Sequence, residues 1–508
     1  MNKTEGLIDI NQLDNDGITQ VLDLAQKFED ALNKKDIEKY KLAGGKDLIV
    51  SLLFYENSTR TRSSFEIAAM RLGMSLTGFG SLEGSSVKKG ESLGHTLDMF
   101  DAYQCDALIL RHPLDGSARY ASERMGIPVF NAGDGKHQHP TQTALDLYTI
   151  RQHLGRIDDF AIGFGGDLRY GRTSHSLVMA LSSRKNVSFY FYSHPSLGMP
   201  ADILELLEER KCHYEISDNL PDVASVVDIF YMTRIQKERL PDGSEFEKAK
   251  KMAAFTPEIM ALTRDSFGLM HPLPIDKTVP GILPDLDFHP KSIYKKQAGN
   301  GVPVRMALLA LSLGLADELN PALILSRPKD SNDFIKELPV KDSLPKEGVS
   351  IRPIRKHGVV LDHLLPWTES ILIELLEIKK RRDIYRSATV RSVSRPENIK
   401  GMLMIEDREL TMRELKLIAS VSPGARVNII NESRVARKLE LSLPDVVEGI
   451  DRLCCPNSGC ISHPRHSEHV SPIFVKVGKS TLKCHYCDTI VKSSNLLDII
   501  SPELVIVE

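Results

Sequence analysis

Short apolar runs alternate with helical patterns through the first three hundred residues. The apolar runs have the length of buried strands and lie at 48–54, 107–110, 127–130, 160–164, 187–192 and 228–232. Helical patterns lie between them at 61–74, 141–153 and 173–182. Strands that alternate with helices in this way predict an α/β protein with parallel sheets.

The alternating units fall into two sets with a break near residues 150–155, which indicates two doubly wound lobes. Ligands of this fold class bind at the C-terminal ends of the strands. The apolar stretch 305–315, RMALLALSLGL, predicts a helix that closes the region. We therefore expect a first lobe at 1–150, closed by a helix at 302–320, and a second lobe at 151–301.

The pattern changes after this helix. Residues 326–348 contain three prolines, many charges and few large apolar residues, which is typical of an interdomain linker. An exposed loop inside one domain is the alternative. Further on, strands are predicted at 351–361 and 427–431, and helices at 369–380 and 411–420. We expect an α+β domain at 349–448 and a small β-rich domain at 449–508.

The composition narrows the class of protein. The chain has 508 residues, 42% hydrophobic and 26% charged, which are ordinary values for a globular protein of several domains. Its net charge of -3 gives no field that would steer it onto nucleic acid or an anionic membrane. It shows no bilayer-spanning run and no signal-peptide pattern at its start, so we expect a cytoplasmic protein without nucleic-acid or membrane partners.

The first chemically informative stretch joins a predicted strand to a predicted helix. It contains Ser58, Thr59, Arg60 and Thr61. The free N–H groups and positive dipole of a helix N-terminus make an anion site, and arginine adds charge-assisted hydrogen bonds to phosphate. An ordinary Ser/Thr helix cap beside surface arginines explains the same residues equally well.

Three further polar stretches follow. Ser85 and Lys89 lie in a short polar loop, for which a solvated basic loop is the commoner explanation. Arg111 directly follows a predicted strand, at the end where ligands bind. His139 and Gln142 lie where a helix begins after another strand, and this setting favours a functional role over that of a structural histidine.

Ser58-Thr59-Arg60-Thr61-Arg62 followed by His139-Pro140-Thr141-Gln142 resembles the carbamoyltransferase family. The resemblance implies that Ser58, Thr59, Arg60 and Thr61 hold the phosphate of carbamoyl phosphate. It further implies that Arg111, His139 and Thr61 face the carbonyl oxygen and that Gln142 lies near the carbamoyl amine. The chemistry agrees, because attack by an amine creates an oxyanion that fixed donors stabilise, and proximity supplies the rest.

The acceptor amine is decided by charge. Aspartate brings two carboxylates and needs arginine or lysine, whereas ornithine brings a second ammonium and needs acidic or neutral groups. Two stretches of the second lobe follow strands and present arginines: GGDLRYGRT at 165–173 and MTRIQKER at 232–239. The glycines of the first do not form the dinucleotide fingerprint G-x-G-x-x-G.

Both stretches resemble the aspartate carbamoyltransferase family. The resemblance implies that Arg172, Arg234 and Gln236 bind the carboxylates of L-aspartate and that Lys89 reaches in as well. In that family the loop with Ser85 and Lys89 comes from a neighbouring subunit, which implies a homotrimer with shared active sites.

The sequence His271-Pro272-Leu273-Pro274 supports the same family, because ornithine enzymes have cysteine in place of Pro272. The resemblance implies a cis bond between Leu273 and Pro274, with the Leu273 carbonyl on the carbamoyl amine. Ile275 departs from the arginine that often follows, which puts the local ion pairs in doubt.

Five of the seven cysteines lie from residue 454 onward. Cys455 with Cys460 and Cys484 with Cys487 form two close pairs of thiols, a set that suits tetrahedral structural Zn²⁺ with no open catalytic position. The sequence around Cys455 resembles the zinc domain of the aspartate carbamoyltransferase regulatory chain. This resemblance implies that Cys454 does not bind the metal. Zinc ribbons can also bind nucleic acid, but no aromatic-rich basic strip accompanies this one.

Residues 349–446 resemble the nucleotide-binding domain of that regulatory chain, most clearly at 358–363. The resemblance implies ATP and CTP as effectors. The candidate effector-binding residues are Asp362, His363, Lys400, Asn428 and Lys438. Met404 and Ser433 depart from the family's lysine and tyrosine, so an ancestral site that no longer binds nucleotides is the alternative.

Together these resemblances predict a catalytic part followed by a regulatory part in one chain. In the family the two parts are commonly separate polypeptides. The implied reaction converts carbamoyl phosphate and L-aspartate to N-carbamoyl-L-aspartate and phosphate in pyrimidine biosynthesis. A carbamoyltransferase for ornithine or another amine is the alternative enzyme. A zinc-dependent assembly protein with a silent transferase lobe is the alternative outside catalysis.

Overall fold

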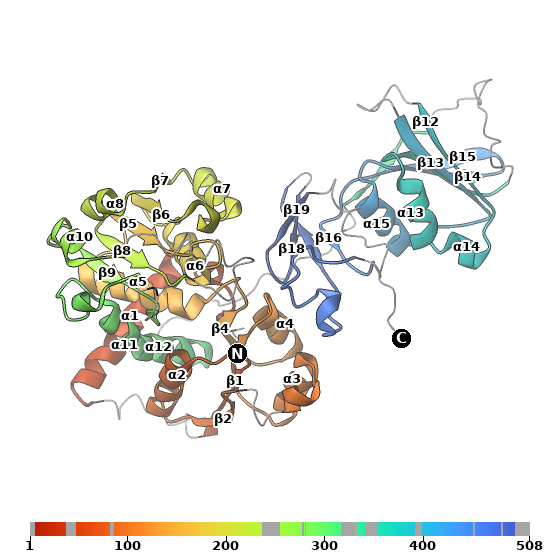
Figure 1. Ribbon diagram of the computed structural model, residues 1–508. Helices are drawn as coiled ribbons and strands as arrows, with labels where there is room; N and C mark the ends of the chain where they lie inside the picture. Colours follow the sequence, from red (N-terminus) through yellow and green to blue (C-terminus); the bar gives the residue numbers. More distant parts are fainter. Residues whose placement is uncertain are drawn as a thin grey trace. The chain divides into compact units, whose positions relative to one another are not determined.

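The chain divides into two compact units, Met1–Leu325 and Ser326–Glu508 (Figure 1). The computed structural model describes residues 6–36, 47–81, 86–235, 254–276, 279, 281–315, 331, 333–340, 354, 356–391, 399–450, 453–478 and 481–492. None of the helices in these ranges is both long and apolar enough to cross a lipid bilayer.

The first lobe has a parallel sheet in the order β2-β1-β3-β4. Its strands are β1 (Ile49–Phe54), β2 (Ser75–Phe79), β3 (Ala107–His112) and β4 (Val129–Asp134). Its helices are α1 (Asn15–Asn33), α2 (Thr59–Arg71), α3 (Leu93–Ala102), α4 (Ser117–Arg124) and α5 (Pro140–Leu154). The strand order reverses between β1 and β3, which is where ligands bind in doubly wound sheets.

The second lobe repeats this plan with a parallel sheet in the order β7-β6-β5-β8-β9. Its strands are β5 (Phe160–Gly165), β6 (Val187–Tyr192), β7 (His213–Ser217), β8 (Ile229–Met232) and β9 (Gly268–Met270). Its helices include α6 (Arg172–Leu181), α7 (Ala201–Glu209), α8 (Leu220–Val226) and α10 (Pro257–Ala261). The α/β class with two parallel-sheet lobes is therefore confirmed.

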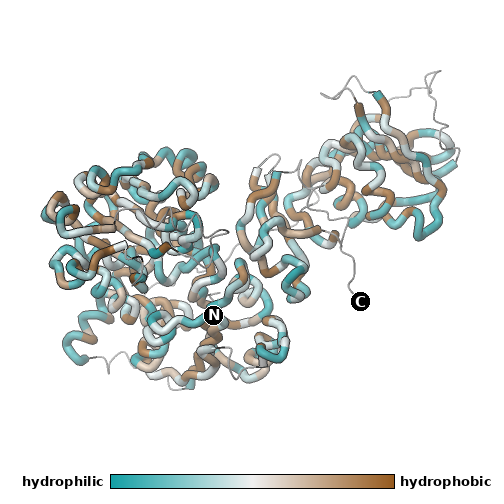
Figure 2. Tube along the Cα trace, in the orientation of Figure 1, coloured by the Kyte–Doolittle hydropathy of each residue, from teal (hydrophilic) through white to brown (hydrophobic). Residues whose placement is uncertain are grey.

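Two consecutive helices, α11 (Tyr294–Gly299) and α12 (Gly301–Ser312), are the last described helices of the first unit. All but one residue of α12 are buried, and the helix packs against α1, α2 and α5 of the first lobe. Its apolar residues join one continuous core with those of both sheets. Figure 2 shows hydrophobic residues along the strands and hydrophilic residues on the outer turns of the helices. The expected closing helix is present; residues 316–320 lie outside the described ranges.

The second unit contains an antiparallel sheet in the order β10-β15-β14-β11-β13-β12. Its strands are β10 (Ile335–Leu338), β11 (Gly358–Leu364), β12 (Tyr385–Arg391), β13 (Ile399–Glu406), β14 (Arg426–Asn431) and β15 (Arg434–Leu441). Helices α13 (Thr368–Leu375), α14 (Ile378–Arg381) and α15 (Met412–Val421) accompany it. The single helix expected at 369–380 is two helices, because Glu377 takes a left-handed backbone conformation with φ 53°. The strand expected from residue 351 begins at Gly358.

The stretch expected to be a linker, 326–348, is corrected over part of its length. Ile335–Leu338 forms β10, an edge strand paired antiparallel with β15. Phe334, directly before it, is buried. An edge strand needs few apolar residues, because one of its sides faces water. Strand β10 was therefore not predicted, because the charged residues and prolines of 326–348 are typical of a linker.

A small antiparallel sheet, β16-β17-β18-β19, ends the described chain. Its strands are β16 (Val446–Val447), β17 (Phe474–Lys476), β18 (Thr481–Cys484) and β19 (Ile490–Lys492). The boundary expected between 448 and 449 is a few residues late, because β16 already pairs with β17.

Candidate active site and metal site

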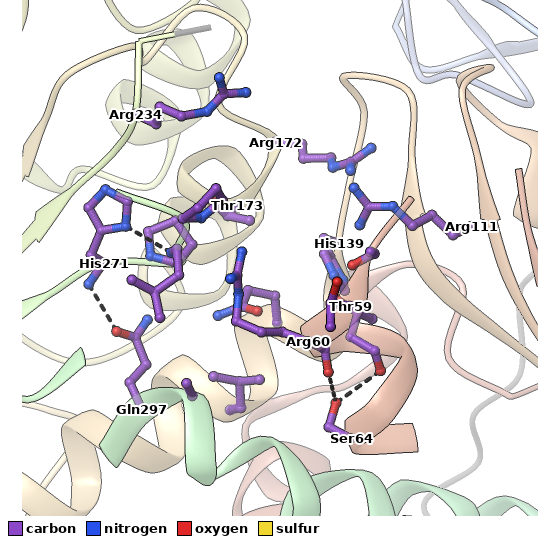
Figure 3. A pocket seen from close by; sticks show the side chains of 18 of the residues that line it. Thr59, Arg60, Ser64, Arg111, His139, Arg172, Thr173, Arg234, His271 and Gln297 are labelled. Carbon is purple, nitrogen blue, oxygen red and sulfur yellow. Dashed lines mark hydrogen bonds between the residues drawn. The ribbon is translucent and has the colours of Figure 1, made fainter. Parts of the chain in front are cut away.

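A cavity of about 620 Å³ lies at the C-terminal ends of the central strands, lined by residues of both lobes of the first unit (Figure 3). The structure brings most of the predicted site residues together here. Those that line the cavity are Ser58, Thr59, Arg60, Thr61, Arg111, His139, Gln142, Arg172, Arg234, Leu273 and Pro274.

The start of α2 forms one end of the cavity. Ser58 is the N-cap residue, but its side chain makes no capping hydrogen bond. The first N–H groups of a helix have no partners within the helix, so those of α2 are available to an anion at this end of the cavity. Arg60 has no described carboxylate within ion-pair distance, and partial burial lowers the pKa of its guanidinium. The start of α2 can therefore bind a phosphate group through free backbone N–H donors and through the positive charge of Arg60.

Glu56 links two of the cavity's arginines. Its Oε2 lies 3.4 Å from Arg111 Nε and 3.4 Å from Arg172 Nη2. The arginines are also fixed by backbone carbonyls, since Arg111 donates to Ala132 at 3.2 Å and Arg172 to Gly135 at 2.6 Å. Figure 3 shows the two guanidinium groups beside each other. Glu56 was assigned no role from the sequence. Its position just after β1, at the ligand-binding edge of the sheet, could have indicated one.

Two neutral histidines face these cations. Burial, reinforced by Arg172, Arg111 and Arg305, holds the pKa of His139 well below its usual value. Burial, with Arg60 and Arg234 nearby, lowers the pKa of His271 to about 3. Neither Nε2 atom has a hydrogen-bond partner among the described residues. At neutral pH each imidazole is therefore uncharged, and its Nε2 atom can form a hydrogen bond with a ligand.

Three buried polar residues in or behind the cavity wall, Asp146, Gln297 and Arg305, were missed by sequence reasoning. Asp146 accepts hydrogen bonds from Gln142 and Gln297, and burial raises the pKa of its carboxyl to about 7. Arg305 lines the cavity while only 2% exposed, and burial lowers its pKa to about 9. Asp146 and Arg305 lie in predicted helices, where a single polar residue gives little signal, and Gln297 lies in α11, a helix that was not predicted.

The acceptor end follows the expectation in part. Arg234 lines the cavity, and the Leu273–Pro274 bond is cis, as the resemblance implied. Ile275 does not line the cavity; it packs against the apolar cluster of the second lobe. Lys89 ends the short 3-10 helix η4 (Ser86–Lys89), is exposed and does not line the cavity. Ser85 and Gln236 lie outside the described residues.

The four predicted metal ligands, Cys455, Cys460, Cys484 and Cys487, are buried, and their Sγ atoms all lie within 4.8 Å of one another. Two of the Sγ–Sγ distances are 3.6 Å and 3.8 Å, far beyond a disulfide bond. Thiolates at the usual Zn–S length of about 2.3 Å would stand about 3.8 Å apart in a tetrahedron. The donor set and spacing therefore fit a structural metal ion. The fifth nearby thiol, Cys454, is outside the group, as predicted.

The predicted effector residues share the open face of the large antiparallel sheet. Val360 stands opposite Met404 on one side and Asn428 on the other, and Asn428 stands opposite Lys438. In the next row Asp362 stands opposite Arg426. Val360 and Asp362 are half-buried, while the alternate positions of β11 face the core.

Ion pairs connect the charged members of this face. Lys400 Nζ lies 2.6 Å from Asp362 Oδ1, and His363 Nδ1 lies 2.9 Å from Asp362 Oδ2. Arg426 contacts His363 Nε2 at 3.1 Å and Glu440 at 3.3 Å. Sequence reasoning missed Arg426 and Glu440, which become neighbours only through strand pairing.

Four family models match the chain in sequence order. The first two are the carbamoyl-P binding domain of aspartate/ornithine carbamoyltransferase, over residues 6–152, and its Asp/Orn binding domain, over 158–312. The other two belong to the aspartate carbamoyltransferase regulatory chain: the allosteric domain over 349–442 and the metal binding domain over 445–496.

Relatives that are aspartate carbamoyltransferase catalytic subunits match about three fifths of the chain. The aspartate carbamoyltransferase catalytic subunit of Thermococcus onnurineus is 45% identical over 315 residues, which are 62% of this chain and 99% of the relative. That of Methanocaldococcus jannaschii is 46% identical over 303 residues, 60% of this chain and 96% of the relative.

Solved structures agree. The catalytic subunit of M. jannaschii aspartate transcarbamoylase superposes with a TM-score of 0.55 at 46% identity, covering 61% of this chain and 97% of that one. The Trypanosoma cruzi enzyme in complex with carbamoyl phosphate and aspartate gives 0.56 at 31% identity, covering 60% and 95%. The chain therefore belongs to the aspartate carbamoyltransferase family, with the catalytic and regulatory parts joined in one polypeptide.

Proposed function

We propose that the cavity transfers the carbamoyl group of carbamoyl phosphate to the amino group of L-aspartate, giving N-carbamoyl-L-aspartate and phosphate for pyrimidine biosynthesis. The charge of the lining carries this proposal. Five arginines line the cavity, and Glu56 is the single carboxylate among the described lining residues. This excess of cations suits a phosphate and two carboxylates, whereas it would repel the side-chain ammonium group of ornithine.

The phosphate end would hold the leaving group. We assign the phosphate to the start of α2, with Ser58, Thr59, Arg60 and Thr61 as its donors. Fixed donors at a helix N-terminus stabilise the charge of the departing phosphate without reorganisation. The C–N bond forms as the C–O bond to phosphate breaks, and the departing phosphate accepts the proton of the amine.

The carbonyl end would stabilise the oxyanion. We assign the developing negative charge on the carbonyl oxygen to Arg111, His139 and Thr61. His139 is held neutral by burial and neighbouring arginines, so it serves as a hydrogen-bond donor and not as a cation. Gln142 and the Leu273 carbonyl would accept the N–H groups of the carbamoyl amine.

The acceptor end would bind the carboxylates of aspartate through Arg172, Arg234, Gln236 and Lys89. Lys89 is exposed and lies outside the lining of its own chain's cavity. This supports a homotrimer in which Ser85 and Lys89 complete the site of a neighbouring subunit. The lobes at 1–150 and 151–301 would then bind carbamoyl phosphate and aspartate respectively.

Replacing Arg234 by alanine should lower kcat/KM for aspartate by about a hundredfold, because one charge-assisted contact to a carboxylate is lost. KM for carbamoyl phosphate should change little. Steady-state kinetics with each substrate varied in turn measure both effects. Arg169→Ala is the matched control, since Arg169 is exposed, belongs to the same lobe and does not line the cavity. Unchanged aspartate kinetics in Arg234→Ala would refute the assignment.

We propose that the four-cysteine group binds Zn²⁺ in a structural role. Its domain would comprise residues 449–508 together with the preceding strand β16. Four thiolates leave no coordination position for substrate. A cytoplasmic, reducing compartment would keep these thiols free to bind metal.

We propose that the open face of the regulatory sheet, in the domain at 349–448, binds ATP or CTP through Asp362, His363, Lys400, Asn428 and Lys438. Their common face supports this proposal. A triphosphate would have to displace Asp362 from Lys400, so we expect weak binding. Activity measured at subsaturating aspartate should shift as either nucleotide is titrated to millimolar concentration. A flat response to both nucleotides would remove the effector role and leave the transferase intact.

A further inference from the structure

Asp146 is a fully buried carboxylate that lies one helical turn after Gln142 on α5. Its Oδ1 accepts hydrogen bonds from Gln142 Nε2 at 2.9 Å and from Gln297 Nε2 at 2.6 Å. Its Oδ2 accepts one from the Tyr231 hydroxyl at 2.8 Å. The donors come from α5, α11 and β8, so one carboxylate ties together both lobes behind the cavity without lining it.

The contact with Gln142 fixes which end of its amide faces the substrate. An ionised carboxylate can only accept hydrogen bonds, so it binds the Nε2 end of the amide. The Oε1 atom is then the end left for the cavity that Gln142 lines. An oxygen in this place can accept from the carbamoyl amine, whereas a flipped amide would oppose one NH₂ group to another.

The contact with Gln297 carries the same effect to the second lobe. Because Gln297 Nε2 is bound to Asp146, its Oε1 is directed to the backbone N–H of His271, which donates to it at 2.9 Å (Figure 3). His271 in turn accepts the backbone N–H of Leu273 on Nδ1 at 2.8 Å. Asp146 is thus connected to both groups assigned to the carbamoyl amine, the Gln142 amide and the Leu273 carbonyl.

We propose that Asp146 is a positioning residue for carbamoyl transfer, which orients the Gln142 and Gln297 amides so that Gln142 Oε1 and the Leu273 carbonyl face the carbamoyl amine. This inference rests on the proposed function. It assigns Asp146 no contact with substrate and no proton transfer.

The charge on Asp146 matters to this role. Its neighbours are the neutral donors Gln142, Gln297 and Tyr231, while Arg305 is the cation close enough to favour ionisation. Burial outweighs these effects and raises the pKa of Asp146 to about 7. A carboxyl protonated at Oδ2 becomes a donor there, so the Tyr231 hydroxyl loses its acceptor while Oδ1 keeps both amides. We therefore expect kcat to fall by only a few-fold as the pH drops through about 7, to the level of the Asp146→Asn variant.

A double-mutant cycle tests the proposal. Asp146→Ala and Gln142→Ala should each lower kcat about tenfold to a hundredfold with little change in KM for aspartate. The loss in the double variant should be smaller than the product of the two single losses, because Asp146 acts in part through Gln142 and in part through Gln297. Asp146→Asn should retain kcat within a few-fold, because its oxygen can keep both amides while its NH₂ group donates to the Tyr231 oxygen. It should also lose the limb of the pH profile near 7.

Tyr231→Phe controls for stability. It removes a buried hydrogen bond and should lower Tm, but it leaves both amides bound and should keep most of kcat. Multiplicative losses in the double variant, or an Asp146→Asn variant as slow as Asp146→Ala, would overturn the proposal. If Asp146→Ala does not fold, Asp146→Asn and its pH profile decide. A wild-type chain that makes no carbamoyl aspartate would instead refute the proposed function itself.

Discussion

Replacing Arg60 by alanine should lower kcat by about a thousandfold and leave the fold unchanged. Loss of one preorganised donor to a developing charge typically costs a hundredfold to a thousandfold, and Arg60 has no described carboxylate that shares its charge. The other cavity arginines cannot replace it, because Glu56 and backbone carbonyls hold Arg111 and Arg172 in place. Initial rates of carbamoyl aspartate formation, together with Tm, measure the effect.

Arg62→Ala is the matched control for this prediction. Arg62 lies two residues further along α2, pairs with Glu66 at 2.7 Å and does not line the cavity. A surface pair of this kind contributes little to stability, so the variant should keep nearly full activity. Equal losses in the two variants would mean that α2 acts through its structure alone.

The Arg60→Ala chain also tests the shared site. In a homotrimer that completes each site with Lys89 of a neighbour, random mixing with Lys89→Ala chains should restore about a quarter of wild-type activity, because some sites then combine both intact residues. Mixtures as inactive as the separate variants would contradict a shared site.

Removing the metal should unfold the small sheet β16–β19 and spare catalysis. Structural zinc supplies on the order of 10–16 kcal/mol of binding free energy, which is as large as the whole stability of an ordinary domain. The cavity should keep its activity, because all of its described lining residues belong to the first unit. A strong chelator, or Cys484→Ser, should therefore abolish metal content and amide protection in residues 453–492 while kcat changes little.

Cys454→Ser separates the metal site from cysteine loss in general. Its Sγ donates to the Cys455 carbonyl at 3.4 Å and lies outside the four-thiol group. This variant should retain one metal ion per chain. Full metal content in Cys484→Ser, or its loss in Cys454→Ser, would contradict the ligand set.

The residues that follow apolar strands could be predicted from the sequence. Arg111 lies at the C-terminal end of β3 and Arg234 lies two residues after β8, and parallel strands place such residues at one edge of each sheet. The fully buried strands of both sheets gave continuous apolar runs, which local pattern detects. The edge strands β2 and β7 were missed, because most of their residues are exposed and their pattern is not apolar.

Residues that act through long-range pairing could not be predicted in the same way. Asp146 and Gln297 are 151 positions apart, and nothing in either local sequence indicates the other. Glu56 acquires its role by contacting Arg111, 55 positions further along the chain, and Arg172 from the other lobe. Strand β10 was hidden for the same reason, since its pairing with β15 supplies the order that its own composition lacks.

The acceptor amine distinguishes an aspartate carbamoyltransferase from an ornithine carbamoyltransferase. The most direct test supplies carbamoyl phosphate to the purified chain with either L-aspartate or L-ornithine and quantifies N-carbamoyl-L-aspartate and citrulline. The arginine-rich cavity predicts rapid formation of carbamoyl aspartate and no citrulline above background. Formation of citrulline without carbamoyl aspartate would show that L-aspartate is not the acceptor.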